Sequence, residues 1–90
     1  MRRFSLGQVV ATPGALKLLE EAGEDPLYLI ARHRSGDWGE LDEHDRRENE
    51  LSLRHGWRLL SSYPVGEGKV WISTEADRSY TTILLPEEEY

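Results

Sequence analysis

A chain of 90 residues is long enough for one small domain and too short for a second hydrophobic core, so we expect a single domain over residues 1–90. The net charge of −6 argues against a protein that grips nucleic acid through its phosphates, because such proteins are usually basic. The sequence has no cysteine, which excludes disulfides and thiolate metal sites and fits a cytoplasmic protein, and no apolar run approaches the ~20 residues of a membrane helix.

The N-terminal third predicts an extended segment followed by two short helices. Residues 4–11 are apolar around a glycine and favour a strand or an extended arm. Thr12-Pro13 supplies a hydroxyl N-cap and a first-turn proline, which predicts a helix over 13–22 that Gly23 ends. Asp25-Pro26 repeats the start signal for a helix over residues 26–34.

A third helix is predicted over residues 43–55, between Asp42 as N-cap and Gly56 as the stop. It is mostly polar and should lie on the surface. Opposite charges spaced four residues apart should contribute ~0.2–0.5 kcal/mol per pair. These pairs are Glu43–Arg47, Arg46–Glu50 and Glu50–Arg54.

Alternating apolar and polar residues predict three consecutive antiparallel strands at 57–63, 70–75 and 80–85. Residues 64–69 form the first connecting loop, and 76–79 form the turn of the second hairpin. The fold expected is therefore α+β: about three short helices followed by a three-stranded antiparallel sheet, which residues 4–11 could join as a fourth strand.

Two regions carry candidate binding residues. The loop at 35–41 contains Asp37 and Trp38 between two glycines, and the hairpin tip contains Glu75, Asp77 and Arg78. The guanidinium fork of Arg78 matches phosphate or carboxylate, although a self-bonded loop explains the same residues.

His33 is the candidate for acid–base chemistry, because its pKa lies near neutrality. Its place at a helix C-terminus also gives it a structural role as a cap. Helix capping likewise explains Asp42 and Asp45 better than metal binding does, so no metal site is expected. The sequence has no phosphate loop, HExxH, GxSxG or dinucleotide fingerprint, and we expect no cofactor.

Several segments together resemble a family of short bacterial proteins, often plasmid-borne, that carry labels such as "plasmid-related protein" and "type I restriction endonuclease subunit M". The segments are LGQVVATPGA at 6–15, RH at 32–33, SGDWG at 35–39, ISTEADRS at 72–79 and TTILLPEE at 81–88. The resemblance covers nearly the whole chain and implies a mobile-element origin but no activity. The restriction label fails on physical grounds, because a methylating subunit needs a longer cofactor-binding α/β domain with a glycine fingerprint.

The expected plan of helices followed by an antiparallel sheet is also similar to that of small microbial ribonucleases and RelE-type toxins. That similarity implies a metal-independent site in which His33 acts as base or acid and Arg78 stabilises the charged transition state, with Thr81 and Ser62 nearby.

The leading hypothesis is a small cytoplasmic accessory or interaction protein with a protein partner and no catalysis. One alternative is the ribonuclease or toxin just described, and another is an acidic nucleic-acid mimic that binds a basic partner. Trp57, Trp71 and Tyr80 are expected in strands, where an exposed aromatic sheet face could pair two chains into a homodimer.

Overall fold

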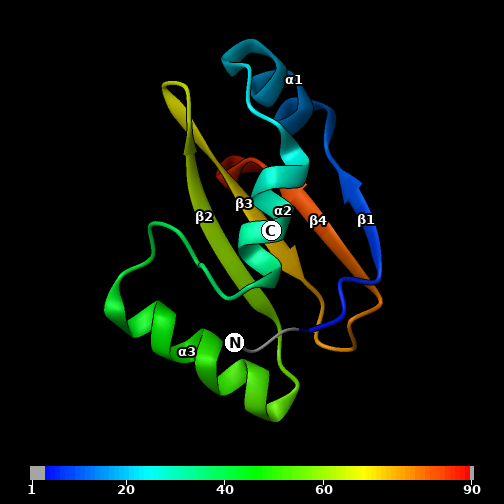
Figure 1. Ribbon diagram of the computed structural model, residues 1–90, viewed down its shortest axis with the longest axis vertical. Coiled ribbons are helices and arrows are strands. Elements are labelled where there is room, and N and C mark those ends of the chain that lie inside the picture. The colour runs from blue at the N-terminus through cyan, green and yellow to red at the C-terminus, as the bar shows by residue number, and fades with distance from the viewer. Residues whose placement is uncertain (1–3, 90) are drawn as a thin grey trace.

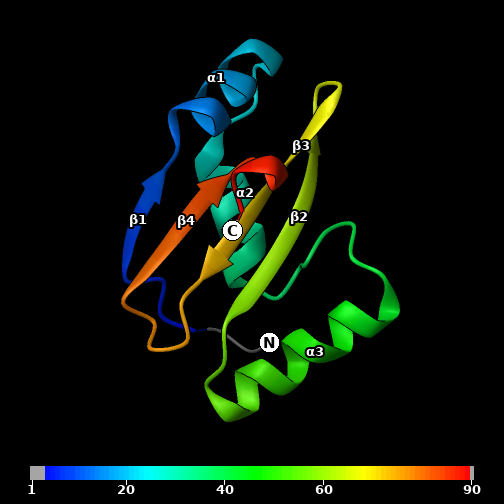
Figure 2. The same ribbon diagram turned by 180° about the vertical axis from the view of Figure 1, so that it is seen from behind.

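The computed structural model describes residues 4–89, which form a four-stranded sheet with helices α1 and α2 on one face (Figure 1). The other face carries the short 3₁₀ helix η1, and α3 lies beside β2 at one end of the sheet (Figure 2). No helix in this part of the chain is long and apolar enough to cross a membrane. In chain order the elements are β1 (Gln8–Ala11), α1 (Pro13–Ala22), α2 (Pro26–Arg34), α3 (Glu43–His55), β2 (Leu59–Val65), β3 (Gly68–Thr74), β4 (Tyr80–Leu84) and η1 (Pro86–Glu88).

All three helices begin and end at the predicted residues. The side-chain oxygens of Thr12, Asp25 and Asp42 each accept a backbone N–H of the first turn that follows. Gly23 and Gly56 end α1 and α3 in the left-handed conformation, with φ of 70° and 75°. Local capping chemistry therefore sets these boundaries.

The sheet has the order β1-β4-β3-β2 and is mixed. The predicted antiparallel meander of β2, β3 and β4 is confirmed, and the N-terminal segment joins it as a fourth strand. This strand, β1, runs parallel to β4, with Val9 opposite Thr81 and Val10 opposite Thr82.

The predicted bounds of the first hairpin are wrong by about two residues. Residues 64–69 do not form a loop, because the two strands continue to Val65 and restart at Gly68, leaving a two-residue turn that opens with Gly66 at φ 57°. Trp57 lies before β2 and is half-exposed, with its ring stacked on His55. The predicted dimer face therefore lacks one of its three strand aromatics.

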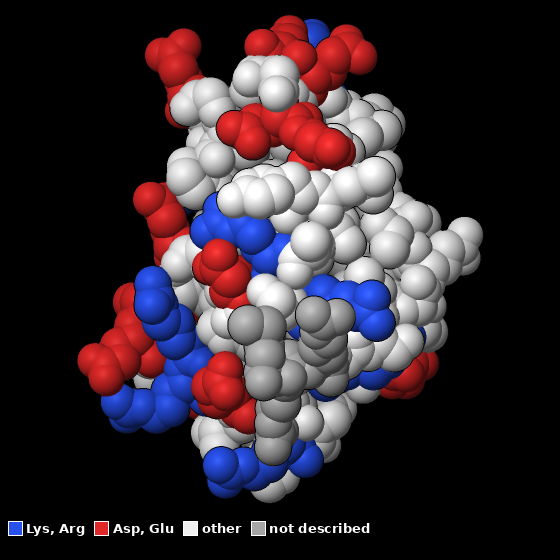
Figure 3. Space-filling model, viewed as in Figure 1, with Lys and Arg blue, Asp and Glu red and all other residues white. Residues whose placement is uncertain are grey.

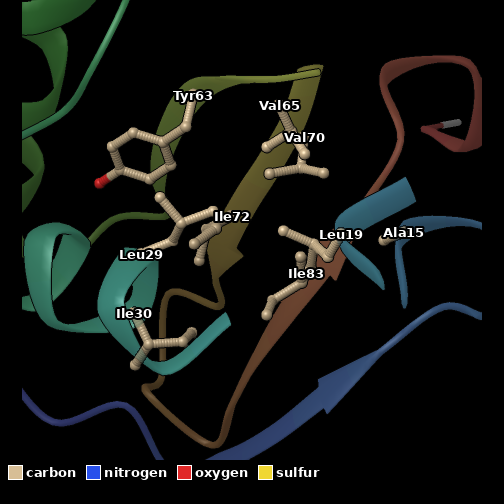
Figure 4. Close-up of a cluster of buried hydrophobic side chains, with 9 residues drawn as sticks. All are labelled: Ala15, Leu19, Leu29, Ile30, Tyr63, Val65, Val70, Ile72 and Ile83. Atoms are coloured by element: carbon tan, nitrogen blue, oxygen red, sulfur yellow. The ribbon is translucent and has the colours of Figure 1, made fainter. Parts of the chain in front are cut away.

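The core lies between the front face of the sheet, defined as the face covered by α1 and α2, and those two helices (Figure 4). Alternate residues of β2, β3 and β4 point into it, as the predicted periodicity requires. Its buried apolar members are Ala15 and Leu19 from α1, Leu29 and Ile30 from α2, and Tyr63, Val65, Val70, Ile72 and Ile83 from the sheet.

The outer edge of β2 is sealed at three successive outward-facing positions. The side chain of Asn49 donates to the carbonyl of Leu60 at 2.6 Å and accepts its N–H at 3.1 Å. The backbone of residues 38–40 pairs with both polar groups of Ser62. Pro64 has no N–H to offer. The edge is thus closed to further pairing.

Gly39 allows the close approach of this loop to β2. Its φ is 75°, and a Cβ at this position would lie 2.0 Å from the carbonyl oxygen of Ser62. Only glycine fits such a contact.

One of the predicted ion pairs of α3 is present, between Glu43 and Arg47 at 3.2 Å. Arg46 instead donates to the carbonyls of Gly39 and Leu41, and Glu50 accepts the indole N–H of Trp38. These charged side chains therefore attach the 36–41 loop to α3.

Candidate binding site

His33 lies in the last turn of α2, where its side chain is fully buried and hydrogen-bonds to the front face of the sheet. Its Nδ1 lies 2.5 Å from Ser61 Oγ, and its Nε2 lies 2.9 Å from Thr74 Oγ1. Thr74 Oγ1 is in turn 2.7 Å from Thr81 Oγ1, and Thr81 donates to the carbonyl oxygen of Leu6 at 2.8 Å. A continuous polar chain therefore crosses from β2 through β3 and β4 to the N-terminal arm.

The carbonyl at the end of this chain assigns every proton in it. The carbonyl oxygen of Leu6 can only accept, so the hydroxyl of Thr81 donates its proton to that oxygen. Thr81 must therefore accept the hydrogen bond that Thr74 donates. Thr74 then accepts from His33, which places the ring proton on Nε2. Nδ1 is left to accept from the hydroxyl of Ser61. His33 is held as one neutral tautomer with both nitrogens engaged.

Burial, and after it the positive charge of Arg78, lowers the pKa of His33 from 6.5 to about 3. The imidazole is therefore neutral throughout the physiological range. A general acid or base at neutral pH needs a pKa near 7 and a nitrogen that substrate can reach. His33 in this arrangement has neither.

Two aromatic rings lie against His33. Phe4 contacts the imidazole edge-on, with ring centroids 5.2 Å apart, and Trp38 does so at 5.8 Å. Phe4 also stacks on Trp38 at 6.2 Å. Trp38 is only 5% exposed, so its side chain is part of the fold rather than a free contact surface.

Arg78 joins the hairpin tip to the end of α3. It has a positive φ of 62°, and its guanidinium donates to the carbonyls of Trp57 at 2.6 Å, Glu75 at 2.9 Å and Ser52 at 3.3 Å. The same group lies 5.8 Å from the centroid of the Phe4 ring. Burial lowers its pKa from the usual value. The structure thus uses Arg78 as a clamp between backbone segments.

Two of the three acidic candidates, Asp37 and Asp77, also have internal partners. Asp37 pairs with Arg32 at 2.7 Å, and this contact lowers the pKa of the Asp37 carboxyl. Asp77 accepts the backbone N–H of Ser79 at 2.9 Å, as a turn residue does, and its pKa is lowered by its bonds with Ser79.

Of the four residues of the ribonuclease hypothesis, the structure brings His33 and Arg78 together on the Phe4 ring, and it links Thr81 to His33 through Thr74. Ser62 lies apart, because it points to the opposite face of β2 from Ser61. The partners Ser61 and Thr74 were missed. The signal for them was a hydroxyl on the core-facing side of an alternating strand, where an apolar residue is the norm.

The back face of the sheet, opposite α1 and α2, has two hollows that share Arg58. One, of about 450 Å³, is lined by Thr12, Arg58, Ser73, Glu75, Tyr80, Thr82, Leu84, Glu88 and Glu89. The other, of about 350 Å³, lies against α3 and is lined by Leu41, His44, Asp45, Glu48, Asn49, Ser52, Arg58 and Leu60. We call the two hollows together the trough.

Arg58 divides the trough and is fixed from both sides. Its Nε–H donates to Ser73 Oγ at 2.7 Å, and its Nη2 donates to both carboxylate oxygens of Glu89, at 2.9 and 2.7 Å. Glu88 is tied to Thr12 at 2.7 Å, and its bonds with the Leu85 N–H and with Thr12 lower its pKa. The C-terminal acidic segment therefore packs along one wall of the trough.

At the start of α3, side-chain atoms of Asp42, His44 and Asp45 that could bind a metal lie within 4.8 Å of one another. Asp42 accepts the backbone N–H of Asp45 at 2.8 Å, so helix capping accounts for its position.

Comparisons of this chain with protein-family models, with curated proteins and with solved structures found no match.

Proposed function

We propose that this chain is a small interaction protein without catalysis, and that it binds a basic, extended segment of a partner protein in the trough on the back face of its sheet. The observation that carries the proposal is a separation of roles. The side chains of the catalytic hypothesis, His33, Thr81 and Arg78, are bonded inside the fold, whereas the trough is lined by unburied carboxylates.

The first half of that observation supports binding over catalysis. Both nitrogens of His33 and the hydroxyl of Thr81 are occupied, and the guanidinium of Arg78 donates to three carbonyls. A nuclease would have to break this network before its groups could touch RNA. Leaving such buried groups unpaired costs about 1–3 kcal/mol each.

The charge of the trough supports a basic partner. Glu75, Glu88 and Glu89 line the first hollow, and Asp45 and Glu48 line the second. Arg58, which lines both hollows, is neutralised by its bidentate pair with Glu89. In a chain of net charge −6, lysine or arginine side chains would be drawn toward this face.

The floor of the trough suits an extended segment. Ser73 and Thr82 lie opposite each other on β3 and β4, and Leu60 is opposite Ser73 on β2. Across β2, β3 and β4 the floor therefore presents one aliphatic side chain followed by two hydroxyl groups. Side chains of one partner segment could enter the two hollows on either side of Arg58. The resemblance to plasmid-borne proteins adds a mobile-element origin to the proposal.

The test is a titration of ¹⁵N-labelled protein with two synthetic peptides, one alternating lysine and valine and one alternating glutamate and valine. We expect the lysine peptide to shift the amide resonances of Ser73, Thr82 and Glu75, and the glutamate peptide to leave them in place. Because the attraction is between exposed charges, the shifts should weaken as salt rises.

A charge-matched pair of variants locates the binding. Glu75→Gln with Glu48→Gln removes one carboxylate from each hollow and should weaken the lysine peptide several-fold. Glu20→Gln with Glu21→Gln removes the same charge from α1 and should leave its affinity unchanged. Equal weakening by the two double variants, or shifts confined to the front face, would refute the trough as the binding site.

A further inference from the structure

The two edges of the sheet are built differently. The outer groups of β2 are sealed at Leu60, Ser62 and Pro64. At the opposite edge, no segment among residues 4–89 pairs with the outer side of β1. β1 is short, but it lacks the proline and the charged side chains that protect other edges: its sequence is QVVA.

The segment that contains β1 is largely apolar and carries no charge of its own. Residues 4–16 include no charged side chain, in a chain of which 31% is charged. Val9 and Val10 are 44% and 40% exposed, on opposite faces of the strand. Tyr80, opposite Gln8, and Leu27 of α2 are exposed as well. The flank along β1 is white in Figure 3, while charges gather elsewhere on that view.

We propose that β1 is a self-association edge, on which a second copy of this chain adds its own β1 antiparallel, so that two sheets join into one. The charge distribution of the chain favours a second copy as the partner on this edge. Two chains of net charge −6 repel one another over most of their surfaces, and β1 is the edge at which copies meet without bringing carboxylates together. This surface borders the first hollow of the trough at Tyr80, but the pairing of β1 edges does not depend on the function proposed for the trough.

The backbone restricts the register, because it decides which residues can exchange hydrogen bonds with a second copy. Gln8 and Thr12 donate their N–H groups to Ser79 and Ile83 of the β4 side, at 3.1 and 2.9 Å, so the even-numbered residues face inward. The N–H and C=O groups of Val9 and Ala11 therefore point outward.

An antiparallel copy satisfies these groups when it is centred on Val10. Val9 and the partner's Ala11 then exchange both backbone hydrogen bonds, and Ala11 and the partner's Val9 do the same. The two Val10 residues meet on the two-fold axis as a non-hydrogen-bonded pair, with Cα atoms about 4.5 Å apart. The closed two-fold pairing gives a dimer.

Single cysteines test the register, because the chain has no cysteine of its own. Val10→Cys should form a disulfide-linked dimer on mild oxidation, since facing residues of this kind have the Cβ separation that a disulfide needs. Val9→Cys is the matched control, on the same strand with nearly equal exposure. Its two copies would be diagonal neighbours about 7–8 Å apart, and it should cross-link at least about tenfold more slowly.

Light scattering tests the association without cysteines. We expect the unmodified protein at about 100 µM to show twice the chain mass of 10.4 kDa. Val9→Pro should show the single mass with an unchanged circular dichroism spectrum, because it removes an outward N–H just as Pro64 does on β2. Should Val9→Pro fail to fold, Val10→Glu places like charges on the two-fold axis and should also give monomers. A monomeric wild type, or equal cross-linking at positions 9 and 10, would overturn the proposal.

Discussion

Acidification should destabilise this protein well before its carboxylates protonate, because His33 is buried as the neutral form. Its pKa is about 3 in the folded chain and about 6.5 in the unfolded chain. Between these values the unfolded chain binds one more proton than the folded chain. The free energy of unfolding therefore falls as pH falls, by up to about 1.4 kcal/mol per pH unit.

The size of the effect follows from the two pKa values. From about pH 8 to about pH 5 the titration of His33 should lower the free energy of unfolding by about 2 kcal/mol. The carboxyls of Asp37 and Asp77 have lowered pKa values, so the stability they contribute is lost only at lower pH. From about pH 8 to about pH 5 these two carboxyls therefore change the free energy of unfolding only slightly.

The assay is urea unfolding at about pH 8 and about pH 5, on the wild type and on His33→Gln, whose amide does not titrate. The fall in stability should be about 2 kcal/mol larger for the wild type than for the variant. NMR of the wild-type imidazole supplies a measurement that does not depend on the variant folding. It should show the Nε2-protonated tautomer persisting to about pH 4.

Titration of the folded His33 ring near pH 6.5 would refute this account, as would an equal loss of stability in the two proteins. Either result would mean that water reaches the imidazole and that the hydrogen-bond chain to Leu6 is open in solution.

A hydroxyl deletion, a glycine replacement and an RNA assay test other parts of the structure. Thr74→Val leaves His33 Nε2 unpaired and should cost about 1–3 kcal/mol in urea unfolding, against under about 0.5 kcal/mol for Thr82→Val on the back face; equal costs would contradict the buried hydrogen bond between Thr74 and His33. Gly39→Ala forces a Cβ to 2.0 Å from a carbonyl oxygen and should prevent folding, whereas Gly56→Ala, with nothing within 4 Å, should cost about 1 kcal/mol by thermal unfolding. RNA incubated with the protein without added metal should stay intact on a denaturing gel, and cleavage that His33→Ala abolishes would refute the non-catalytic proposal.

The sequence predicts the helices better than the sheet because helix ends depend on neighbouring residues. Thr12, Asp25 and Asp42 act within one turn of their own position, so their role is visible in the sequence. The pairing of β1 with β4 joins residues about 70 positions apart, and no local pattern encodes its parallel direction. The predicted end of β2 is too early because the prediction assigns Pro64 to a loop, although proline is also tolerated on the outer edge of a sheet.

The candidate site follows the same division. His33 could be singled out from its type and position, but its burial depends on Phe4 and Trp38, which come from other parts of the fold. Arg78 joins the hairpin tip to α3 by donating to the carbonyls of residues 52 and 57. The alternating pattern of the hairpin gives no information about these distant partners. The trough was missed because its wall is the C-terminal segment, whose packing against Arg58 is a long-range contact.

The sealed edge of β2 limits what any strand addition can build. A sheet with two free edges can polymerise, since each added copy offers a new edge to the next and growth has no natural end. Here Asn49, the backbone of residues 38–40 and Pro64 terminate one side. A chain that associates through β1 has no second edge with which to propagate, so the assembly stops at two copies and does not grow into a filament.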